Sequence, residues 1–247
     1  MQTAAAIIVA AGRGTRLAGP VAKQFLPLGG RPILRRTLET FDGSPLIDTI
    51  WLVLAPENFS YCRRNVLGSY FGTPIQLVQG GAERQVSVYN ALRVMPPDQE
   101  WVVVHDGVRP LVTTDMIAAG LREAVKTGAS VLAIPADETV KRSDASGCIE
   151  ATLEREKLWL VQTPQTFRYD LILKAHRQAL RDGFQATDDA VLVERIGHPV
   201  KIVPGRRRNL KITTAEDLVM AEALLRKGLE SDPDVAATAP SAGQRAQ

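Results

Sequence analysis

Cysteine, net charge and long apolar runs are all scarce in this sequence of 247 residues. Its two cysteines, Cys62 and Cys148, lie far apart and form no CxxC pair. This spacing argues against a zinc site or a disulfide framework and favours a reducing compartment. The 30 basic and 27 acidic residues leave a net charge of +3, which is too balanced for a protein that coats nucleic acid. Any anion binding must therefore depend on particular lysines and arginines.

The first apolar stretch, Ala4 to Ala11, is too short to cross a membrane. No basic segment precedes it and Gly12-Arg13-Gly14 follows it directly, so it lacks the flanks of a signal peptide. We therefore expect a cytoplasmic protein that binds neither membranes nor nucleic acid.

Short apolar runs alternate with amphipathic segments along the chain. The predicted strands are residues 5–11, 49–56, 75–81, 101–107 and 129–136. They are apolar throughout, as is typical of parallel strands covered on both faces. The predicted helices include 32–41, 86–95 and 114–128, the last running from an N-cap at Thr114 to a stop at Gly128. The alternation predicts an α/β fold, a Rossmann-like three-layer sandwich with a mostly parallel sheet, whose ligands bind at the carboxyl ends of the strands.

Residues 137–157 interrupt this pattern with two polar segments around a Ser-Asp-Ala-Ser-Gly turn. They predict a protruding β-hairpin arm with too little apolar surface to be stable alone, and such an arm usually packs against a second subunit. Residues 229–247 are rich in Ala, Pro and Ser and have no periodic pattern, which predicts a disordered tail or linker. We expect one domain over residues 1–228, with the arm as its dimerisation element.

The loop after the first predicted strand lacks two common nucleotide-binding signatures. Leu17 occupies the third glycine position of G-x-G-x-x-G, and no Gly-Lys-Ser/Thr follows. A phosphate cradle remains, in which Gly12 and Gly14 let backbone N–H groups approach a triphosphate while Arg16 and Lys23 supply positive charge. The alternative is an ordinary strand–helix turn with incidental arginines.

Several motifs in order resemble one nucleotidyltransferase family. They are A-A-G-x-G-x-R with Lys-Gln and Gly-Gly-Arg-Pro-Ile-Leu after it, then GGAERQVSV (80–88), VHDGVRP (104–110), ETVKR (138–142), WLVQTPQTF (159–167), ATDDA (186–190) and GRRRNLKITTAEDL (205–218). Residues 4–227 thereby resemble the 2-C-methyl-D-erythritol 4-phosphate cytidylyltransferase family of the non-mevalonate isoprenoid pathway. Ala22 stands where this family often has proline, and Val86 stands where a polar residue is common.

The resemblance implies that the phosphate of a polyol phosphate attacks the α-phosphate of CTP and releases pyrophosphate. Because the nucleophile is already an anion, the reaction needs alignment and charge stabilisation but no general base. The triphosphate implies Mg²⁺ or another divalent cation, held mostly by phosphate oxygens. The resemblance also implies a homodimer that exchanges its arms.

The residues expected to stabilise the reacting phosphates are carried over from the resemblance: Arg16, Lys23, Arg155 and Lys211. Lys211 lies in an apolar stretch before Thr213-x-x-Glu216, which predicts a capping box and places the lysine at the carboxyl end of a strand. The preceding Arg206–Arg208 run is as well explained by a solvated turn.

Base selection is expected from backbone groups of Ala10, Ala11 and Gly81 with the Ser87 hydroxyl. The polyol phosphate side is expected to draw on Arg109, Thr139, Arg155, Thr163 and Thr187. Two of these assignments have ordinary structural alternatives. Thr187 with Asp188 could merely cap a helix over 189–196, and TPQTF could be a turn.

Asp106 ends the most apolar predicted strand, where an unpaired carboxylate is unusual. It could contact Mg²⁺ or a substrate hydroxyl, or it could form a structural ion pair with Arg109. His105 beside it is expected to be a hydrogen-bonded scaffold residue. Two alternatives to the family's activity stay open: transfer to another polyol phosphate such as ribitol 5-phosphate, and a nucleotide-binding regulatory module without chemistry.

Overall fold

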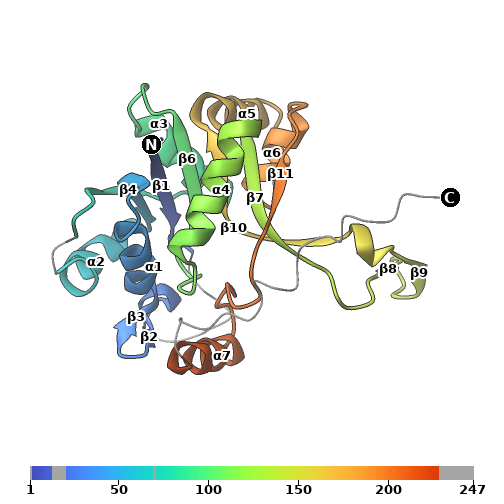
Figure 1. The fold of residues 1–247 in the computed structure, drawn as a ribbon, viewed down its shortest axis with the longest axis horizontal. Helices are drawn as coiled ribbons and strands as arrows, with labels where there is room; N and C mark the ends of the chain where they lie inside the picture. Colours follow the sequence, from blue (N-terminus) through green and yellow to red (C-terminus); the bar gives the residue numbers. More distant parts are fainter. Residues whose placement is uncertain (1, 13–20, 69–70, 228–247) are drawn as a thin grey trace, which may run out of the picture.

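The computed structural model describes residues 2–12, 21–68 and 71–227 (Figure 1). Gly14 and Arg16 of the expected cradle, and the expected tail at 229–247, lie outside these residues. Within them, seven strands form one sheet in the order β11-β7-β10-β6-β1-β4-β5. Their bounds are β1 Ala4–Val9, β4 Ile47–Leu54, β5 Ile75–Gln79, β6 Trp101–Asp106, β7 Ala129–Pro135, β10 Trp159–Arg168 and β11 Lys201–Pro204. All neighbours pair in parallel except β10, which runs antiparallel to both β6 and β7.

Helices cover both faces of the sheet (Figure 1). Alternate residues of β1 point to opposite faces: Ala6 and Ile8 pack in one apolar cluster, and Ala5 and Ile7 in another. The first cluster includes α1 (Ile33–Asp42), α2 (Phe59–Asn65) and α4 (Thr114–Thr127), and the second includes α3 (Arg84–Val94), α5 (Tyr169–Arg181) and α6 (Asp189–Arg195). This is the three-layer α/β sandwich that the apolar runs predict.

The five predicted strands and the three predicted helices are confirmed, with ends that differ by a few residues. The cap of α4 is one residue earlier than predicted, because the Thr113 hydroxyl accepts a hydrogen bond from the N–H of Met116. Gly128 ends this helix as predicted, with a φ of 85° that favours glycine.

Strand β10 corrects the interpretation of TPQTF as a turn. Residues 163–167 lie within this ten-residue strand. Its pairing with β7 is interrupted between Val161 and Gln165, and the Thr163–Pro164 peptide bond is cis. The polar side chains of Gln162 and Thr163 are nevertheless buried here, beside the end of β6.

The predicted hairpin is present as β8 (Lys141–Ser143) and β9 (Ile149–Thr152), which pair antiparallel. It protrudes from the side of the body, beyond the ends of β7 and β10 (Figure 1). A 3-10 turn at Arg155–Lys157 leads from β9 back to β10. The two strands of the arm are largely exposed, as their polar sequence predicts.

Helix α7 (Ala215–Arg226) lies across one end of the molecule, near the small hairpin of β2 (Pro27–Leu28) and β3 (Arg31–Pro32) (Figure 1). Its capping box is formed by Thr214 and Asp217, not by Thr213 and Glu216 as predicted. Two further 3-10 turns span Lys23–Phe25 and Pro56–Asn58. No helix among the described residues is long and apolar enough to cross a membrane.

Candidate active site

Two cavities open at the carboxyl ends of the parallel strands. The larger, of about 660 Å³, lies beyond β1, β4 and β5. It brings together many of the predicted residues: Ala10, Ala11, Gly12, Lys23, Gly81, Ser87, Asp106 and Lys211. Segments far apart in the sequence meet here because parallel strands end at the same edge of a sheet.

One wall of the larger cavity is built from small residues, among them Ala11, Gly81 and Ser87. The Gly81 N–H donates to the Ser87 hydroxyl oxygen at 3.0 Å, so these two predicted residues are in direct contact. A Cβ on Gly80 would lie only 2.3 Å from the Ala11 Cβ, so glycine permits this close approach of the two loops. The Ser87 hydroxyl accepts from Gly81 and keeps its own proton to donate.

Lys23 lies on the 3-10 turn Lys23–Phe25 at the rim of the same cavity. The next residue, Gln24, is buried and donates through Nε2 to the carbonyl oxygen of Ala10 at 2.9 Å. This bond ties the lysine-bearing turn to the end of β1. Because the Ala10 N–H donates to the Val53 carbonyl and its carbonyl oxygen accepts from Gln24, only the second lone pair of that oxygen remains for a base.

The second cavity, of about 450 Å³, lies beside the first and extends along β10 toward α6. It is lined by Arg109, Thr163 and Thr187, three of the residues predicted for the polyol phosphate. Thr187 precedes Asp188, whose carboxylate accepts from the Val191 N–H and caps α6 as the alternative interpretation predicts. Capping by Asp188 leaves the Thr187 side chain on the cavity wall.

Asp106 ends β6 among three cations. Its carboxylate lies 3.2 Å from Arg84 Nε, 3.5 Å from Arg109 Nε and 3.0 Å from Lys211 Nζ. Burial alone would raise the pKa of Asp106, but the positive charges of these three groups outweigh burial and hold it below its ordinary range. Asp106 is therefore ionised throughout the neutral range and joins cations from three separate segments of the chain.

Lys211 reaches this site from an irregular loop, not from the end of a strand as predicted. Strand β11 ends at Pro204, and the chain runs through residues 205–211, which we call the lysine loop, before α7 begins. The Lys211 ammonium lines both cavities, and about two fifths of its side chain is exposed. Its position relative to the phosphates therefore depends on the course of this loop.

Arg84 and Asp189 are site residues that sequence reasoning missed. Arg84 Nη1 pairs with Asp189 Oδ2 at 2.6 Å while its Nε reaches Asp106, so the guanidinium bridges two buried carboxylates. Their charges raise the pKa of Arg84 although burial opposes this. One signal was available: Arg84 begins α3, and a cation in the first turn of a helix is unfavourable unless anions surround it.

His105 is the scaffold residue that the sequence predicts. The Thr163 hydroxyl accepts from the Asp106 N–H and contacts His105 Nδ1 at 3.0 Å, and His105 Nε2 lies 3.2 Å from the Arg109 carbonyl oxygen. These partners match a neutral ring protonated on Nε2. Burial lowers the pKa of His105 to about 3, so the ring stays neutral.

Asp106 does not fit the role of a metal ligand in this arrangement. Its Oδ1 faces Arg84 and its Oδ2 faces Arg109 and Lys211, so both oxygens already pair with cations whose charges would repel a metal ion. The described residues also contain no group of three or more His, Cys, Asp or Glu side chains that could hold a metal. The ion-pair alternative fits Asp106 better.

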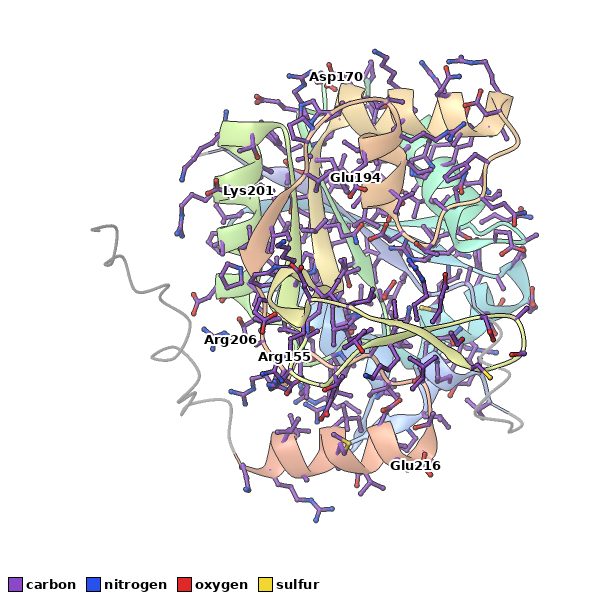
Figure 2. The ribbon with its side chains drawn as sticks, turned by 90° about the vertical axis from the view of Figure 1, so that its right-hand side faces the viewer. Arg155, Asp170, Glu194, Lys201, Arg206 and Glu216 are labelled. Atoms are coloured by element: carbon purple, nitrogen blue, oxygen red, sulfur yellow. The ribbon has the colours of Figure 1, made fainter. Side chains whose placement is uncertain are left out.

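Two predicted residues lie away from both cavities. Thr139 and Arg155 belong to the arm, and neither lines either cavity within the described part of the chain. The Arg155 side chain is about half exposed and donates to the Asp137 carbonyl oxygen at 3.1 Å. Figure 2 views the molecule with the arm toward the reader, with Arg155 at its base. A single chain therefore does not bring these residues to the other site residues.

Comparisons with known proteins give the same family as the sequence motifs. The family model described as 2-C-methyl-D-erythritol 4-phosphate cytidylyltransferase matches residues 4–227. The chain is 47% identical over 223 residues to the protein of that name from Caldanaerobacter subterraneus subsp. tengcongensis, covering 90% of this chain and 98% of the relative. It is also 47% identical over 224 residues to the bifunctional enzyme IspD/IspF of Desulforudis audaxviator, covering 90% of this chain and 57% of the relative.

A solved structure shares the whole architecture. The 4-diphosphocytidyl-2C-methyl-D-erythritol synthase of Anaerococcus prevotii superimposes with a TM-score of 0.81 at 32% identity, covering 91% of this chain and 99% of that one. The motifs, the paired cavities and the family match thus agree. The chain belongs to the 2-C-methyl-D-erythritol 4-phosphate cytidylyltransferase family.

Proposed function

We propose that this chain joins CTP and 2-C-methyl-D-erythritol 4-phosphate to give 4-diphosphocytidyl-2-C-methyl-D-erythritol and pyrophosphate, a step of isoprenoid precursor biosynthesis. The relatives' names support both substrates. The observation that carries the proposal is the wall between the two cavities. Arg84, Asp106 and Lys211 line both, so a nucleotide in one cavity and a phosphate in the other would meet beside the same charges.

The larger cavity is assigned to CTP. Ala11, Gly81 and Ser87 form a wall of small groups for the cytosine, and a hydroxyl that can donate suits its ring nitrogen or carbonyl oxygen. Gly12 and Lys23, which line the same cavity, are assigned to the triphosphate. Gly14 and Arg16 of the expected cradle are assigned to it as well, from the sequence alone. The smaller cavity, with Arg109, Thr163 and Thr187, is assigned to the polyol phosphate.

The reaction forms one bond and breaks one bond at the α-phosphorus. An oxygen of the polyol phosphate attacks it, and the bond to the bridging oxygen of the departing pyrophosphate breaks. No proton must be removed from the nucleophile, which agrees with the neutral, fully hydrogen-bonded His105. The protein's contribution is to hold two anions together and to stabilise the charge that develops.

Lys23 and Lys211 are assigned to that stabilisation, together with Arg16. Lys211 is held 3.0 Å from Asp106 at the junction of the cavities, and Lys23 lies on the CTP side. Mg²⁺ would arrive with the triphosphate and be held by phosphate oxygens, where it would neutralise charge on the leaving pyrophosphate. No protein ligand is assigned to it.

Thr139 and Arg155 are assigned to the polyol phosphate site of a partner chain in a homodimer. The arm and its base expose Ile149, Leu160 and Val161, whose exposed fractions are 67%, 54% and 44%. Such a concentration of apolar side chains on a polar arm is typical of a surface that a partner covers. Packing the arm on a second subunit would bury this surface and bring Arg155 to the other site residues.

We also place the reaction in the cytoplasm. Both cysteines are free: Cys62 is buried on α2, and Cys148 is exposed on the arm. An exposed free thiol is more easily maintained in a reducing compartment.

The test is a pyrophosphate-release assay with CTP and the purified chain, crossed with 2-C-methyl-D-erythritol 4-phosphate, erythritol 4-phosphate and ribitol 5-phosphate. We expect turnover with the first, much less with the others, and loss of activity on chelation that Mg²⁺ restores. Preferred turnover of ribitol 5-phosphate would redirect the assignment to another polyol cytidylyltransferase. Tight CTP binding without turnover of any acceptor would favour a regulatory module.

A further inference from the structure

The lysine loop, residues 205–211, follows a fixed course although it has no regular secondary structure. At its start the Gly205 N–H donates to the Ala133 carbonyl oxygen at 2.7 Å. A Cβ on Gly205 would lie 2.5 Å from Gln162 Oε1, so only glycine allows the loop to approach β10 this closely. Just past its end, the Ile212 N–H donates to the Val108 carbonyl oxygen at 2.9 Å.

Gln162 binds the lysine loop with its side-chain amide. Its Nε2 donates to the Arg206 carbonyl oxygen at 2.9 Å, and its Oε1 accepts from the Arg206 N–H at 3.3 Å. The residue is buried and lies where the pairing of β10 with β7 is interrupted. Such an interruption redirects a side chain away from the regular ladder. The side chain of Gln162 thus pairs with the loop as a neighbouring strand would.

Asn209 is the second anchor, and its side chain is completely buried. Its Nδ2 donates to Gln162 Oε1 at 3.2 Å and to the Thr163 carbonyl oxygen at 2.8 Å. Its own carbonyl oxygen accepts from Arg109 Nη1 at 2.7 Å. Asn209 therefore connects the loop to three residues that line the smaller cavity, and Lys211 follows only two positions later.

These anchors matter because the Lys211 side chain itself has few restraining contacts. The ammonium has its ion pair with Asp106, but the side chain is partly exposed, and such pairs restrict a long side chain only weakly. A misplacement of about 1 Å at a reacting group can cost about a hundredfold in rate. The loop also contains the basic run Arg206–Arg208, a sequence that is typical of a solvated, mobile turn. The buried amides supply the rigidity that the loop's own sequence lacks.

We propose that Gln162 and Asn209 are positioning residues that act through Lys211, by fixing the backbone from which its ammonium reaches the junction of the two cavities. The proposal rests on the proposed role of Lys211 in phosphate transfer. It assigns no contact with substrate to either amide.

A double-mutant cycle tests this dependence. We expect Asn209→Ala to lower kcat/KM by roughly ten- to a hundredfold. In a Lys211→Ala background, the same change should cost less than about twofold, because the group it positions is gone. Asn65→Ala, which removes an exposed amide–carbonyl hydrogen bond from α2, is the matched control and should leave kcat/KM unchanged.

The isosteric Gln162→Glu variant provides a second test in case Asn209→Ala does not fold. The carboxylate still accepts from Arg206 and Asn209 but cannot donate to the Arg206 carbonyl oxygen, so we expect a smaller loss with the same dependence on Lys211. Thermal unfolding of each variant identifies those that fold. If Asn209→Ala or Gln162→Glu lowered kcat/KM by the same factor in the Lys211→Ala background as in the parent chain, the inference would be overturned. A fully active Lys211→Ala would instead refute the proposed role of the lysine.

Discussion

At the scale of single residues, a nearly neutral chain concentrates positive charge at one point. Arg84, Arg109 and Lys211 converge on Asp106, and Arg84 also pairs with Asp189. Three cations against two carboxylates leave one positive charge in excess at the junction of the cavities. The carboxylates hold the cations in place against their mutual repulsion, so the surplus charge is already oriented when a phosphate arrives.

Base recognition depends on the contact between Gly81 and Ser87, and Ser87→Ala tests it. We expect the ratio of kcat/KM for CTP to that for UTP to fall, because a site that hydrogen-bonds one base discriminates through those bonds. Steady-state kinetics with each nucleotide measures the ratio. Ser44→Ala, a buried serine outside both cavities, is the control and should preserve it. An unchanged ratio in Ser87→Ala would assign recognition to the backbone alone.

The buried His105 makes stability depend on pH. Its pKa is about 3 in the folded chain against an ordinary 6.5, so between these values the unfolded chain binds more protons. The free energy of unfolding should therefore fall as pH decreases through this window, by up to about 1.4 kcal/mol per pH unit from this residue. Below about pH 4, Asp106 adds a loss in the same direction, because its pKa is also depressed.

Urea unfolding between pH 6.5 and 4.5 measures this dependence, and His105→Gln should have a shallower slope than the parent chain over the same range. The absolute stability of the variant does not matter, because the comparison uses the slope. Equal slopes for the two proteins would show that His105 is protonated in the folded state or that it is not buried.

At the scale of elements, the sequence predicts what is strongly patterned and misses what is polar. Apolar runs identify β1, β4, β5, β6 and β7, because strands covered on both faces have few solvent-facing positions. Strand β10 escapes this reasoning because Gln162, Thr163 and Gln165 are buried polar residues whose side-chain hydrogen bonds appear only after folding. Sequence motifs could therefore mark TPQTF as functional without showing that it was a strand.

The site residues also fall into those that the sequence predicts and those that it misses. Gly12, Gly81 and Asp106 lie at or next to the carboxyl ends of predicted strands, and Lys23 and Ser87 lie in the segments that follow such strands. The rule on carboxyl ends therefore brings these residues together. Arg84 and Asp189 gain their importance from each other, at a separation of 105 residues that no local pattern shows. Lys211 was identified by motif, but its loop and the buried amides that hold it depend on tertiary contacts.

Helix ends offer a matched pair of glycines. Gly128 after α4 and Gly197 after α6 have φ values of 85° and 82°. Alanine at Gly197 would meet nothing within 4 Å, so it should cost about 1–2 kcal/mol of backbone strain alone. Alanine at Gly128 would lie 2.9 Å from the His198 ring, so it should cost more. Chemical denaturation measures both, and His198→Ala should reduce the Gly128→Ala cost to that of Gly197→Ala.

At the scale of the whole molecule, the arm separates two parts of the expected polyol phosphate site. Arg109, Thr163 and Thr187 line the smaller cavity, whereas Thr139 and Arg155 lie on or beside an arm that extends away from the body (Figure 1). At the base of the arm, Asp137 pairs with Arg207 of the lysine loop and accepts from Arg155. The arm is thus connected to the site's own loop, while under the proposed exchange of arms its substrate-binding candidates would serve the site of another chain.

An exchanged arm predicts complementation between inactive subunits. If each site takes Lys23 from one chain and Arg155 from the other, Lys23→Ala and Arg155→Ala homodimers should both be nearly inactive. Equal mixing with subunit exchange makes about half of the dimers mixed, and each mixed dimer has one intact site and one doubly damaged site. Activity should therefore recover to roughly a quarter of the parent value.

Exchange must be shown independently, by a tag on one variant that captures the other. Lys126→Ala is the control partner for Arg155→Ala, because Lys126 is an exposed lysine on α4 away from both cavities. The activity of that mixture should not rise on exchange, because exchange with an active partner creates no additional site that has both Lys23 and Arg155. If each site used Arg155 from its own chain, every site in a mixed dimer of the two inactive variants would stay damaged. Proven exchange without recovery of activity would therefore place Arg155 in its own chain's site.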